Sequence, residues 1–564
     1  MSQRHLAVWP RELPRSLVPP RTSVWANLEI SARRYPDKPA FVCYDNALSF
    51  SRLQAEAEKL AGYLQKRCGV AKGDRVILFA QTSLNFVIAY YAILRADAVV
   101  VPLNPMNLAH ELRQYAADCG ATVAIVAQEL WPQAAPLAAE GLFAHAVVAT
   151  YSDYLPGPTD LRVADAFSLA RQPIAGPNVT SWADAIAEDL APSRHTAGPD
   201  DLACMPYTSG TTGDPKGCMH THRSMMHTLV GGGEWFRTVP ETVYLAVLPF
   251  FHVTGMQGSM NGPIYMGNTV VMLPRWDRDA AAALIRRHRV QAWSLIPTMV
   301  VDLLASPHAA TFDLSSLQRM TGGGAAMPEA VATKLQQTCG ITFVEGYGLS
   351  ETMAPTHINP PERPKKQCLG IPIFDTESMV VDPDTLAELP AGEVGEIVTS
   401  GPQIFLGYWG KPGATAEAFF ERDGRRFFRT GDLGRVDEEG YFFIVDRLKR
   451  MINASGLKVW PAEVEAQLYA HPDIQEACVI AARDARRGET PKAVVVLKPD
   501  RRGHTSAEQI IAWAHQRMAA YKAPTLVEFV DSLPKTATGK LQWRLLQERE
   551  NARAAGRADP APAR

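Results

Sequence analysis

The stretch "MPYTSGTTGDPKGCMHTH", residues 205–222, gathers Gly, Ser and Thr around one lysine, Lys216. Such residues can offer backbone N–H groups and hydroxyls to a polyphosphate, and the lysine adds a positive charge. The pattern departs from a Walker A loop because Gly210 and Gly213 lie too close together and Gly217, not Ser or Thr, follows the lysine. The residues therefore favour a phosphate loop of another kind, with a plain Gly-Ser-Thr hairpin as the simpler alternative.

Four more short motifs follow along the chain: "GYGLSET" (346–352), "RTGD" (429–432), "DRLKRMINASG" (446–456) and "PKTATGK" (534–540). Together with "YTSGTTGDPKG" and in this order, they resemble the adenylate-forming enzymes, which include acyl-CoA synthetases, firefly-type luciferases and stand-alone adenylation domains. The resemblance extends over nearly the whole chain. It implies that a carboxylate attacks the α-phosphate of ATP, and that an AMP-forming acyl-CoA synthetase then passes the acyl group to coenzyme A.

The attack brings two negatively charged groups together, so magnesium and cationic side chains must neutralise the phosphate oxygens. Hard oxygen ligands suit Mg²⁺, and the resemblance implies Glu351 and the Thr208 hydroxyl as its ligands. The alternative for Glu351 is a helix-cap or surface carboxylate. By the resemblance, the cradle of the β- and γ-phosphates consists of Thr208, Ser209, Gly210, Thr211, Thr212 and Gly213, with Lys216 assisting.

The nucleoside part of ATP has its own implied residues. Tyr347 resembles the ring that stacks on adenine, and Asp432 would accept hydrogen bonds from both ribose hydroxyls, with Arg447 donating nearby. An ordinary surface ion pair is the alternative for Asp432 and Arg447. The glycines beside Tyr347 are expected to allow close approach of the base. The remaining residues of the implied adenine site are Gly323, Gly324, Ala325, Glu345, Gly346, Gly348 and Ser350.

Two reactions have to share one site, and the resemblance implies a moving C-terminal domain for that purpose. Lys540 is the implied catalytic lysine of adenylate formation, Lys449 the pivot of the hinge, and Gly456 the residue that keeps the path of coenzyme A open. The alternative is that Lys540 and Lys449 are ordinary solvated lysines.

The acid itself is constrained by the segment Leu245–Arg275, which contains no Asp or Glu to pair with an amino group. We expect a medium- or long-chain fatty acid, with aryl or branched acids as the runner-up. His252 is expected at the carboxylate end of the acyl pocket, with a hydrogen-bonded core histidine as the alternative. Met256 stands where some long-chain synthetases carry an aromatic gate. Space for the chain is expected at Gly255, Gly258, Ser259, Gly262 and Gly267.

The histidines of "HTHRSMMH", residues 220–227, invite a metal interpretation, which the lack of Cys or carboxylate partners at zinc-like spacing disfavours. Net charge is −2, so nothing draws the chain to nucleic acid. Eight scattered cysteines without a C-x-x-C pair favour a reducing compartment. The longest apolar run, "FVIAYYAIL" at 86–94, is too short to span a bilayer. We expect a cytoplasmic enzyme; a homodimer stays open.

Buried strand patterns alternate with helical patterns from residue 74, for example "DRVILFA", "SLNFVIAYYAILRA" and "AVVVPLNP". Such alternation predicts an α/β fold with parallel sheets covered on both faces. We expect a large N-terminal body of several subdomains (1–445), a hinge (446–456), a small mobile α+β domain (457–550) and a disordered tail (551–564). Residues 150–195 are expected to form a surface excursion.

Three other functional classes compete with this prediction. A P-loop NTPase or kinase would need a helix directly after the lysine and would release ADP or phosphate instead of pyrophosphate. A non-catalytic relative would be expected to lack Glu351 or Lys540, and both are present. A ligase that passes its adenylate to a carrier protein instead of coenzyme A is harder to separate from the sequence.

Overall fold

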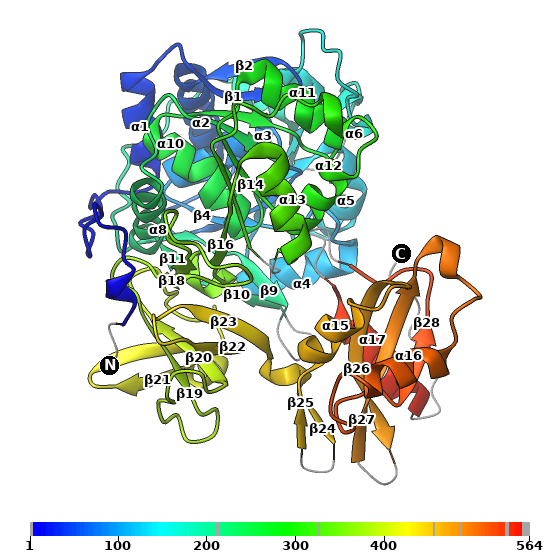
Figure 1. Cartoon of the computed structure of the whole chain (residues 1–564). Coiled ribbons are helices and arrows are strands. Elements are labelled where there is room, and N and C mark those ends of the chain that lie inside the picture. The colour runs from blue at the N-terminus through cyan, green and yellow to red at the C-terminus, as the bar shows by residue number, and fades with distance from the viewer. Residues whose placement is uncertain are drawn as a thin grey trace. The chain divides into compact units, whose positions relative to one another are not determined.

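The computed structural model describes residues 4–174, 176, 178–209, 215–323, 327–454, 457–484, 488–535 and 541–554. The chain forms two compact units (Figure 1). The body unit comprises Gln3–Glu377 and Thr399–Phe428, and the C-terminal unit comprises Ser378–Val398 and Arg429–Arg564. The hinge predicted at 446–456 lies inside the C-terminal unit, and the predicted domain division remains a prediction.

A seven-stranded sheet of the body unit confirms the alternation read from the sequence. Strand β3 (Arg75–Phe79) leads through helix α3 (Leu84–Arg95) to β4 (Val99–Pro102), and α4 (Ala109–Cys119) connects to β5 (Val123–Ala127). Both β4 and β5 pair in parallel with β3, because each helix carries the chain back along the sheet. The order is β11-β8-β4-β3-β5-β6-β7, the other strands being β6 (His145–Ala149), β7 (Val179–Ser181), β8 (Leu202–Cys204) and β11 (His220–Thr221).

A nine-stranded sheet forms the second layer, in the order β18-β17-β16-β15-β14-β12-β13-β1-β2. Its strands from β13 to β16 are parallel, so their carboxyl ends lie at one edge, where ligands of open α/β sheets bind. The strands are β1 (Pro39–Cys43), β2 (Asn46–Ser49), β12 (Val243–Ala246), β13 (Thr269–Met272), β14 (Ala292–Leu295), β15 (Arg319–Gly322), β16 (Phe343–Tyr347), β17 (His357–Ile358) and β18 (Ile371–Pro372).

The two faces of this sheet belong to different cores because successive strand residues point to opposite sides. Leu245 and Trp293 pack in the cluster formed with α11, α12 and α13, which stand close together in Figure 1. Their neighbours Tyr244 and Ala292 belong to the larger cluster that includes α2 and α3. The helices are α1 (Trp25–Arg34), α2 (Phe50–Lys66), α5 (Trp131–Ala139), α8 (His222–Trp235), α11 (Arg278–His288), α12 (Pro297–Leu304) and α13 (Glu329–Cys339).

The expectation of a mere surface excursion at residues 150–195 is wrong. Its strand β7 extends the seven-stranded sheet by pairing in parallel with β6. Phe167 and Trp182 are at most 2% exposed, with Phe167 stacked on Tyr151 at 4.4 Å between ring centroids. The segment folds into the core because it supplies large aromatic rings, a signal that its Pro- and Gly-rich composition obscures.

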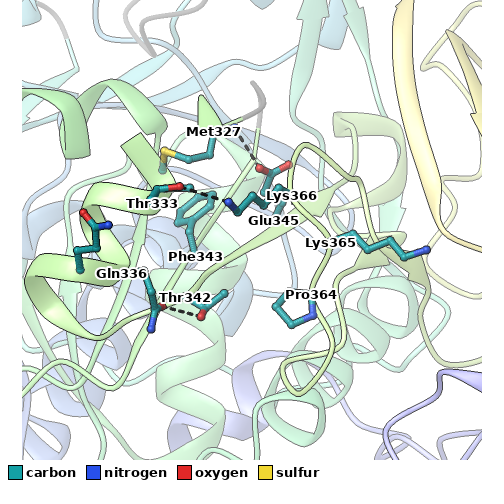
Figure 2. A pocket seen from close by; sticks show the side chains of 11 residues that line it. Met327, Thr333, Gln336, Thr342, Phe343, Glu345, Pro364, Lys365 and Lys366 are labelled. Atoms are coloured by element: carbon teal, nitrogen blue, oxygen red, sulfur yellow. Dashed lines mark hydrogen bonds between the residues drawn. The ribbon is translucent and has the colours of Figure 1, made fainter. Parts of the chain in front are cut away.

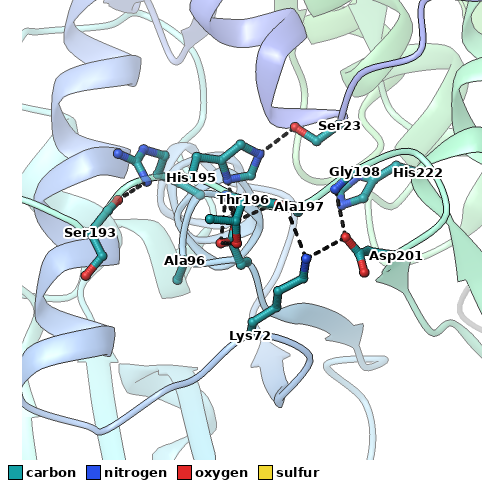
Figure 3. Close-up of polar contacts among 12 residues, drawn as sticks. Ser23, Lys72, Ala96, Ser193, His195, Thr196, Ala197, Gly198, Asp201 and His222 are labelled. Carbon is teal, nitrogen blue, oxygen red and sulfur yellow. Dashed lines mark hydrogen bonds and ion pairs between the residues drawn. The ribbon is translucent and has the colours of Figure 1, made fainter.

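An extended strap, residues 188–201, leads into β8 and is fastened by side chains of the body unit (Figure 3). Asp97 accepts hydrogen bonds from the Thr196 hydroxyl at 2.6 Å and its N–H at 2.9 Å, and pairs with His195 Nδ1 at 2.5 Å. His195 Nε2 lies 2.7 Å from the Ser23 hydroxyl. Ser23, His195 and Asp97 are connected as in a serine hydrolase triad, but Ser23 is 3% exposed and out of a substrate's reach. These contacts therefore serve to hold the strap in place.

A second set of contacts fixes the end of the strap beside helix α8. Lys72 forms an ion pair with Asp201 at 2.8 Å and donates to the Thr196 carbonyl at 3.1 Å. The Val24 N–H donates to His222 Nδ1 at 3.0 Å, at the first residue of α8. Because β8 and α8 stand on either side of the Gly-rich stretch in the sequence, these contacts hold both of its flanks.

The C-terminal unit contains an independent sheet in the order β25-β24-β27-β26, with β28 beside β27. Helix α16 (Ala507–His515) connects the parallel strands β27 and β28, so this part of the unit is a βαβ arrangement. Helix α17 (Trp543–Ala554) runs four residues into the stretch predicted as a disordered tail. The other elements are β24 (Ile452–Ala454), β25 (Leu457–Val459), α15 (Pro461–Leu468), β26 (Ile474–Asp484), β27 (Gly488–Leu497) and β28 (Leu526–Phe529).

One long strand takes part in two hairpins. Strand β22 (Arg425–Val436) pairs with β21 (Phe419–Arg422) in the body unit and continues into the C-terminal unit, where it pairs with β23 (Phe442–Arg447). β19 (Glu377–Val381) and β20 (Gly395–Ser400) precede them. Within the described ranges, no helix combines the length and apolarity needed to cross a membrane.

Candidate active site

Two short paired strands flank residues 210–214. Strands β9 (Tyr207–Ser209) and β10 (Pro215–Gly217) are antiparallel, with Lys216 opposite Thr208. The lysine therefore lies on a strand, whereas a Walker A lysine begins a helix, which argues against the P-loop alternative. The expected cradle residues Gly210, Thr211, Thr212 and Gly213 lie outside the described residues, as does the side chain of Ser209.

Glu351 occupies a short helical turn, η6 (Ser350–Thr352), and its side chain is largely buried, at 8% exposure. The alternative of a surface carboxylate is therefore wrong. The turn is held from two sides: His220 Nε2 lies 2.7 Å from the Ser350 carbonyl, and the Phe405 N–H donates to the Glu351 carbonyl at 2.9 Å. A buried carboxylate requires partners, and its surroundings supply them.

Tyr408 is the residue of this site that the sequence reasoning missed. Its hydroxyl donates to Glu351 Oε1 at 3.0 Å, and Lys216 Nζ lies 5.0 Å from the centre of its ring. The only sequence signal was the aromatic residue beside Gly407, which by itself is weak. The structure thus brings together one anion and one cation that are 135 positions apart in the sequence, with a tyrosine contacting both.

The expected adenine residues lie at the end of β16. Tyr347 is 8% exposed, and its ring lies 5.7 Å from that of His357 on β17. A Cβ at Gly323 would lie 2.3 Å from Gly346 O, and one at Gly348 would lie 2.8 Å from the Ala354 Cα. These glycines are thus required where backbone meets backbone, whatever the base demands. Gly324 and Ala325 lie outside the described residues.

Glu345, two residues before Tyr347, lines a pocket of about 320 Å³ (Figure 2). It accepts a hydrogen bond from the Met327 N–H at 3.1 Å, and burial raises the pKa of its carboxyl to about 7. Lys366 donates to Thr333 at 3.3 Å beside it. The pocket thus offers a poised acceptor and nearby cationic groups; its lining includes Met327, Thr333, Gln336, Phe343, Lys365 and Lys366.

The expected ribose residues form an ion pair in the C-terminal unit. Arg447 Nε lies 2.8 Å from Asp432 Oδ1, because the two residues face each other across β22 and β23. Asp432 is 1% exposed, so an ordinary surface pair does not describe it. Lys449 belongs to the turn η7 (Leu448–Arg450), its side chain lying outside the described residues together with Gly456 and Lys540.

The three histidines of "HTHRSMMH" face different partners. Beside His220 and His222, already described, His227 Nε2 lies 3.0 Å from the Phe374 carbonyl. His252 is exposed and accepts from the Thr254 N–H at 3.4 Å, so the alternative of a core histidine is wrong. His252 begins the short helix α9 (Val253–Gly255), which continues as the π-helical turn η4 (Met256–Asn261).

The small residues along this segment are not equivalent. Gly258 is exposed, and a Cβ there would approach only Ser294 Oγ, at 3.7 Å. Gly255 instead packs on backbone, since its Cβ would lie 2.3 Å from Pro249 O, and the same holds for Gly262, 2.9 Å from Gln257 O. Ser259 is fully buried, and a Cβ at Gly267 would lie 2.4 Å from the Tyr35 ring, so neither position leaves space. The expectation of room at all five positions is therefore wrong for four of them.

Met256 is also not a gate to solvent. Its side chain is fully buried, with Sδ 3.5 Å from the Tyr90 hydroxyl and 3.8 Å from Cys204 Sγ. The exposed face of the segment carries His252 and Gly258, opposite Ser294 on β14. Ser294 Oγ lies 3.2 Å from the Thr321 hydroxyl of β15, so the facing sheet is small and hydroxylated. We call this face, defined by His252, Gly258, Ser294 and Thr321, the Gly258 face.

Two family models match this chain. A family model described as AMP-binding enzyme matches residues 28–409, and one described as AMP-binding enzyme C-terminal domain matches residues 463–540. The chain belongs to the AMP-binding enzyme family. The predicted superfamily and α/β fold are thus confirmed, and the chain is an AMP-forming ligase of the acyl-CoA synthetase class.

Relatives in this family match nearly the whole chain. The long-chain-fatty-acid–CoA ligase of Bacillus subtilis (strain 168) is 36% identical, with 97% of this chain and 98% of the relative covered. A feruloyl-CoA synthase of Amycolatopsis sp is 34% identical, with 90% and 95% covered. The crystal structure of ATP-bound MatB from Rhodopseudomonas palustris superposes with a TM-score of 0.82 at 29% identity, covering 94% of this chain and 99% of that one.

Proposed function

We propose that this enzyme activates a medium- or long-chain fatty acid with ATP, forming an acyl adenylate and pyrophosphate, and then transfers the acyl group to coenzyme A with release of AMP. The observation that carries the proposal is the meeting of Lys216 and Glu351 at Tyr408, beside the Gly-rich hairpin. A fixed cation and a fixed anion of this kind suit a magnesium-bound polyphosphate.

Glu351 and Thr208 would hold the magnesium ion. Their oxygens are the hard ligands that Mg²⁺ prefers, and one or two protein ligands suffice where phosphates supply others. In the described part of the chain no group of three His, Cys, Asp or Glu side chains forms a metal cage of its own. When bound, the ion would neutralise charge on the phosphate oxygens. Lys216 would bind the same oxygens from β10.

By the family resemblance, Tyr347 and Glu345 would recognise the adenine, and Asp432 and Arg447 would bind the ribose. Asp432, buried and acceptor-only, suits the two ribose hydroxyls. By the family resemblance, Lys540 stabilises the attack on the α-phosphate, Lys449 is the pivot between the two reactions and Gly456 borders the path of coenzyme A.

The acid would lie along the Gly258 face, with its carboxylate toward His252. Absence of acidic side chains from Leu245 to Arg275 disfavours amino acids, and the fatty-acid ligase relative supports an alkyl chain. An aryl acid is the second candidate, since the Ser294–Thr321 hydroxyl pair could bind a ring substituent and a relative is a feruloyl-CoA synthase. We place the reaction in the cytoplasm, where all eight free cysteines would stay reduced; a homodimer remains a prediction.

A panel of acids tests this proposal. Acids of two to eighteen carbons, cinnamic acids carrying ring hydroxyls and several amino acids are each incubated with ATP, Mg²⁺ and coenzyme A. We expect pyrophosphate and AMP in equal amounts, with thioester, for the longer fatty acids. Release of ADP would overturn the adenylation chemistry, and preference for cinnamic acids would select the second candidate. Thioester on a carrier protein but none on coenzyme A would overturn the acceptor.

A further inference from the structure

Tyr408 contacts both charged side chains of the proposed site, and the proposed function gives it no role of its own. We infer that Tyr408 is a positioning residue of the adenylation step: its hydroxyl aims the Glu351 carboxylate, and its ring keeps Lys216 from pairing with that carboxylate. The inference rests on the proposed function, because it concerns the same two charged side chains.

The backbone of Tyr408 is fixed by the strand that carries Lys216. Tyr408 forms an antiparallel bridge with Cys218, the Trp409 N–H donates to the Gly217 carbonyl at 2.9 Å, and the Met219 N–H donates to the Gly407 carbonyl at 3.0 Å. Residues opposite each other in an antiparallel pair point to the same side, as do residues two apart in one strand. Lys216 therefore shares a face with Tyr408, in agreement with the 5.0 Å separation of Nζ from the ring centre.

Gly407 allows the backbone to take the path that presents Tyr408. Its φ of 150° is a conformation that L side chains rarely adopt, and a Cβ there would lie 2.5 Å from Thr415 Cγ2. The hydroxyl of Thr415 accepts from the Tyr408 N–H at 2.9 Å. The position and direction of Tyr408 are thus set by backbone contacts on both sides, independently of its own hydroxyl.

The hydroxyl of Tyr408 acts as the donor toward Glu351, because an ionised carboxylate can only accept. It reaches Glu351 Oε1 from one side, while the Phe405 N–H holds the Glu351 backbone. With both carboxylate rotation and backbone restrained, the second carboxylate oxygen has one preferred direction, which is what a metal ligand requires.

The ring of Tyr408 concerns the Lys216 ammonium, which lies 5.0 Å from its centre. An ammonium and a carboxylate that meet in a partly dry site attract strongly, and such a pair would occupy the groups that must bind phosphate and metal. Tyr408 gives each charge a partner of its own: the carboxylate receives a hydrogen bond, and the ammonium lies near the negative face of a ring. Neither partner is lost when a magnesium-bound polyphosphate arrives.

Tyr408→Phe tests this arrangement because it keeps the ring and removes only the donor. Mn²⁺ is titrated into protein saturated with a non-hydrolysable ATP analogue, and free Mn²⁺ is read by electron paramagnetic resonance. We expect the dissociation constant of Mn²⁺ to rise ten- to a hundredfold, the range for losing a partner that orients a metal ligand. The Mg²⁺ concentration for half-maximal pyrophosphate release should rise in parallel, with little change in the KM of the acid.

Tyr63→Phe is the matched control, since it removes a tyrosine hydroxyl bonded to Thr180 Oγ1 at 2.7 Å away from these residues. It should leave metal binding unchanged. A double-mutant cycle keeps the test sharp even if Tyr408→Phe loses some stability: with Glu351→Gln already present, removing the Tyr408 hydroxyl should add little further loss of Mn²⁺ binding.

Wild-type Mn²⁺ affinity in Tyr408→Phe, or additive losses in the cycle, would overturn the inference. A merely structural tyrosine would lower the Tm and the active fraction while leaving the metal titration of the folded protein unchanged, and that outcome also overturns it. Failure of the proposed function has a separate signature, because the wild-type enzyme itself would then release no pyrophosphate with any acid.

Discussion

Replacing Gly255 with alanine would place a Cβ 2.3 Å from Pro249 O and 2.7 Å from Leu248 O. Both atoms are backbone, so relief requires a movement of about 1 Å rather than a rotamer change, and overpacking of this kind costs about 1–3 kcal/mol. The backbone of Gly255 is helical (φ −66°, ψ −42°), where alanine would otherwise gain about 0.5–1 kcal/mol. We expect a net loss of about 1–2 kcal/mol, enough to lower the Tm by a few degrees.

Gly258→Ala provides the matched comparison three residues later. Its Cβ would meet Ser294 Oγ at an ordinary 3.7 Å, so the Tm should stay within about a degree of wild type. Gly258→Leu should occupy space along the Gly258 face and reduce the chain length of the preferred fatty acid. The assay pairs thermal unfolding with pyrophosphate release across acids of increasing chain length. A Gly255→Ala enzyme as stable as wild type, with an altered acid preference, would refute the assignment of Gly255 to backbone packing.

Three further predictions concern charge and motion. Glu351→Gln should lower acid-dependent pyrophosphate release by about a hundredfold or more, since a preorganised charge is lost, with little change in Tm because the amide can still accept from Tyr408. Burial alone would raise the pKa of Asp97, but hydrogen bonds from His195 and Thr196 hold it well below its usual value. Its contribution to stability is therefore present above about pH 4 and lost as pH falls, so Asp97→Asn should cost about 1.5–3 kcal/mol at pH 7 in urea unfolding and much less near pH 2. Lys540→Ala should block adenylate formation while supplied acyl adenylate and coenzyme A still give thioester, whereas Lys449→Pro should do the reverse because a fixed φ freezes the pivot.

Each has an outcome that contradicts it. Full activity in Glu351→Gln removes that carboxylate from the proposed magnesium site. An Asp97→Asn penalty that is equal at pH 7 and at pH 2 would show that the ionised form of Asp97 is not what fastens the strap. Loss of the same half-reaction in Lys540→Ala and Lys449→Pro would mean that this enzyme does not alternate between two poses.

Local patterns were sufficient for much of the fold. Apolar runs such as "RVILF" become strands that are buried on both faces, and helix α3 begins at Leu84, the second residue of the quoted helical pattern. The order of five short motifs identified the family, because each motif carries its chemistry within a few adjacent residues. The segment 150–195 was misjudged because four buried aromatic side chains contribute more to burial than its many Pro and Gly residues take away.

The roles of individual residues depended on partners that the chain brings from far away. Gly255 and Gly258 look alike in "VTGMQGSM". A Cβ at Gly255 would meet the Pro249 carbonyl, whereas a Cβ at Gly258 would approach only Ser294 Oγ. This difference follows from the folded path of residues 248–258. Tyr408 stands 57 positions from Glu351, and nothing near it in the sequence indicates a carboxylate. Its function follows from the pairing with β10, a contact that only the folded chain creates. Sequence determines which chemical groups are present and how their own strand or helix runs; tertiary structure decides which groups meet, because hydrogen bonds and charges act over a few ångströms of space and not along the chain.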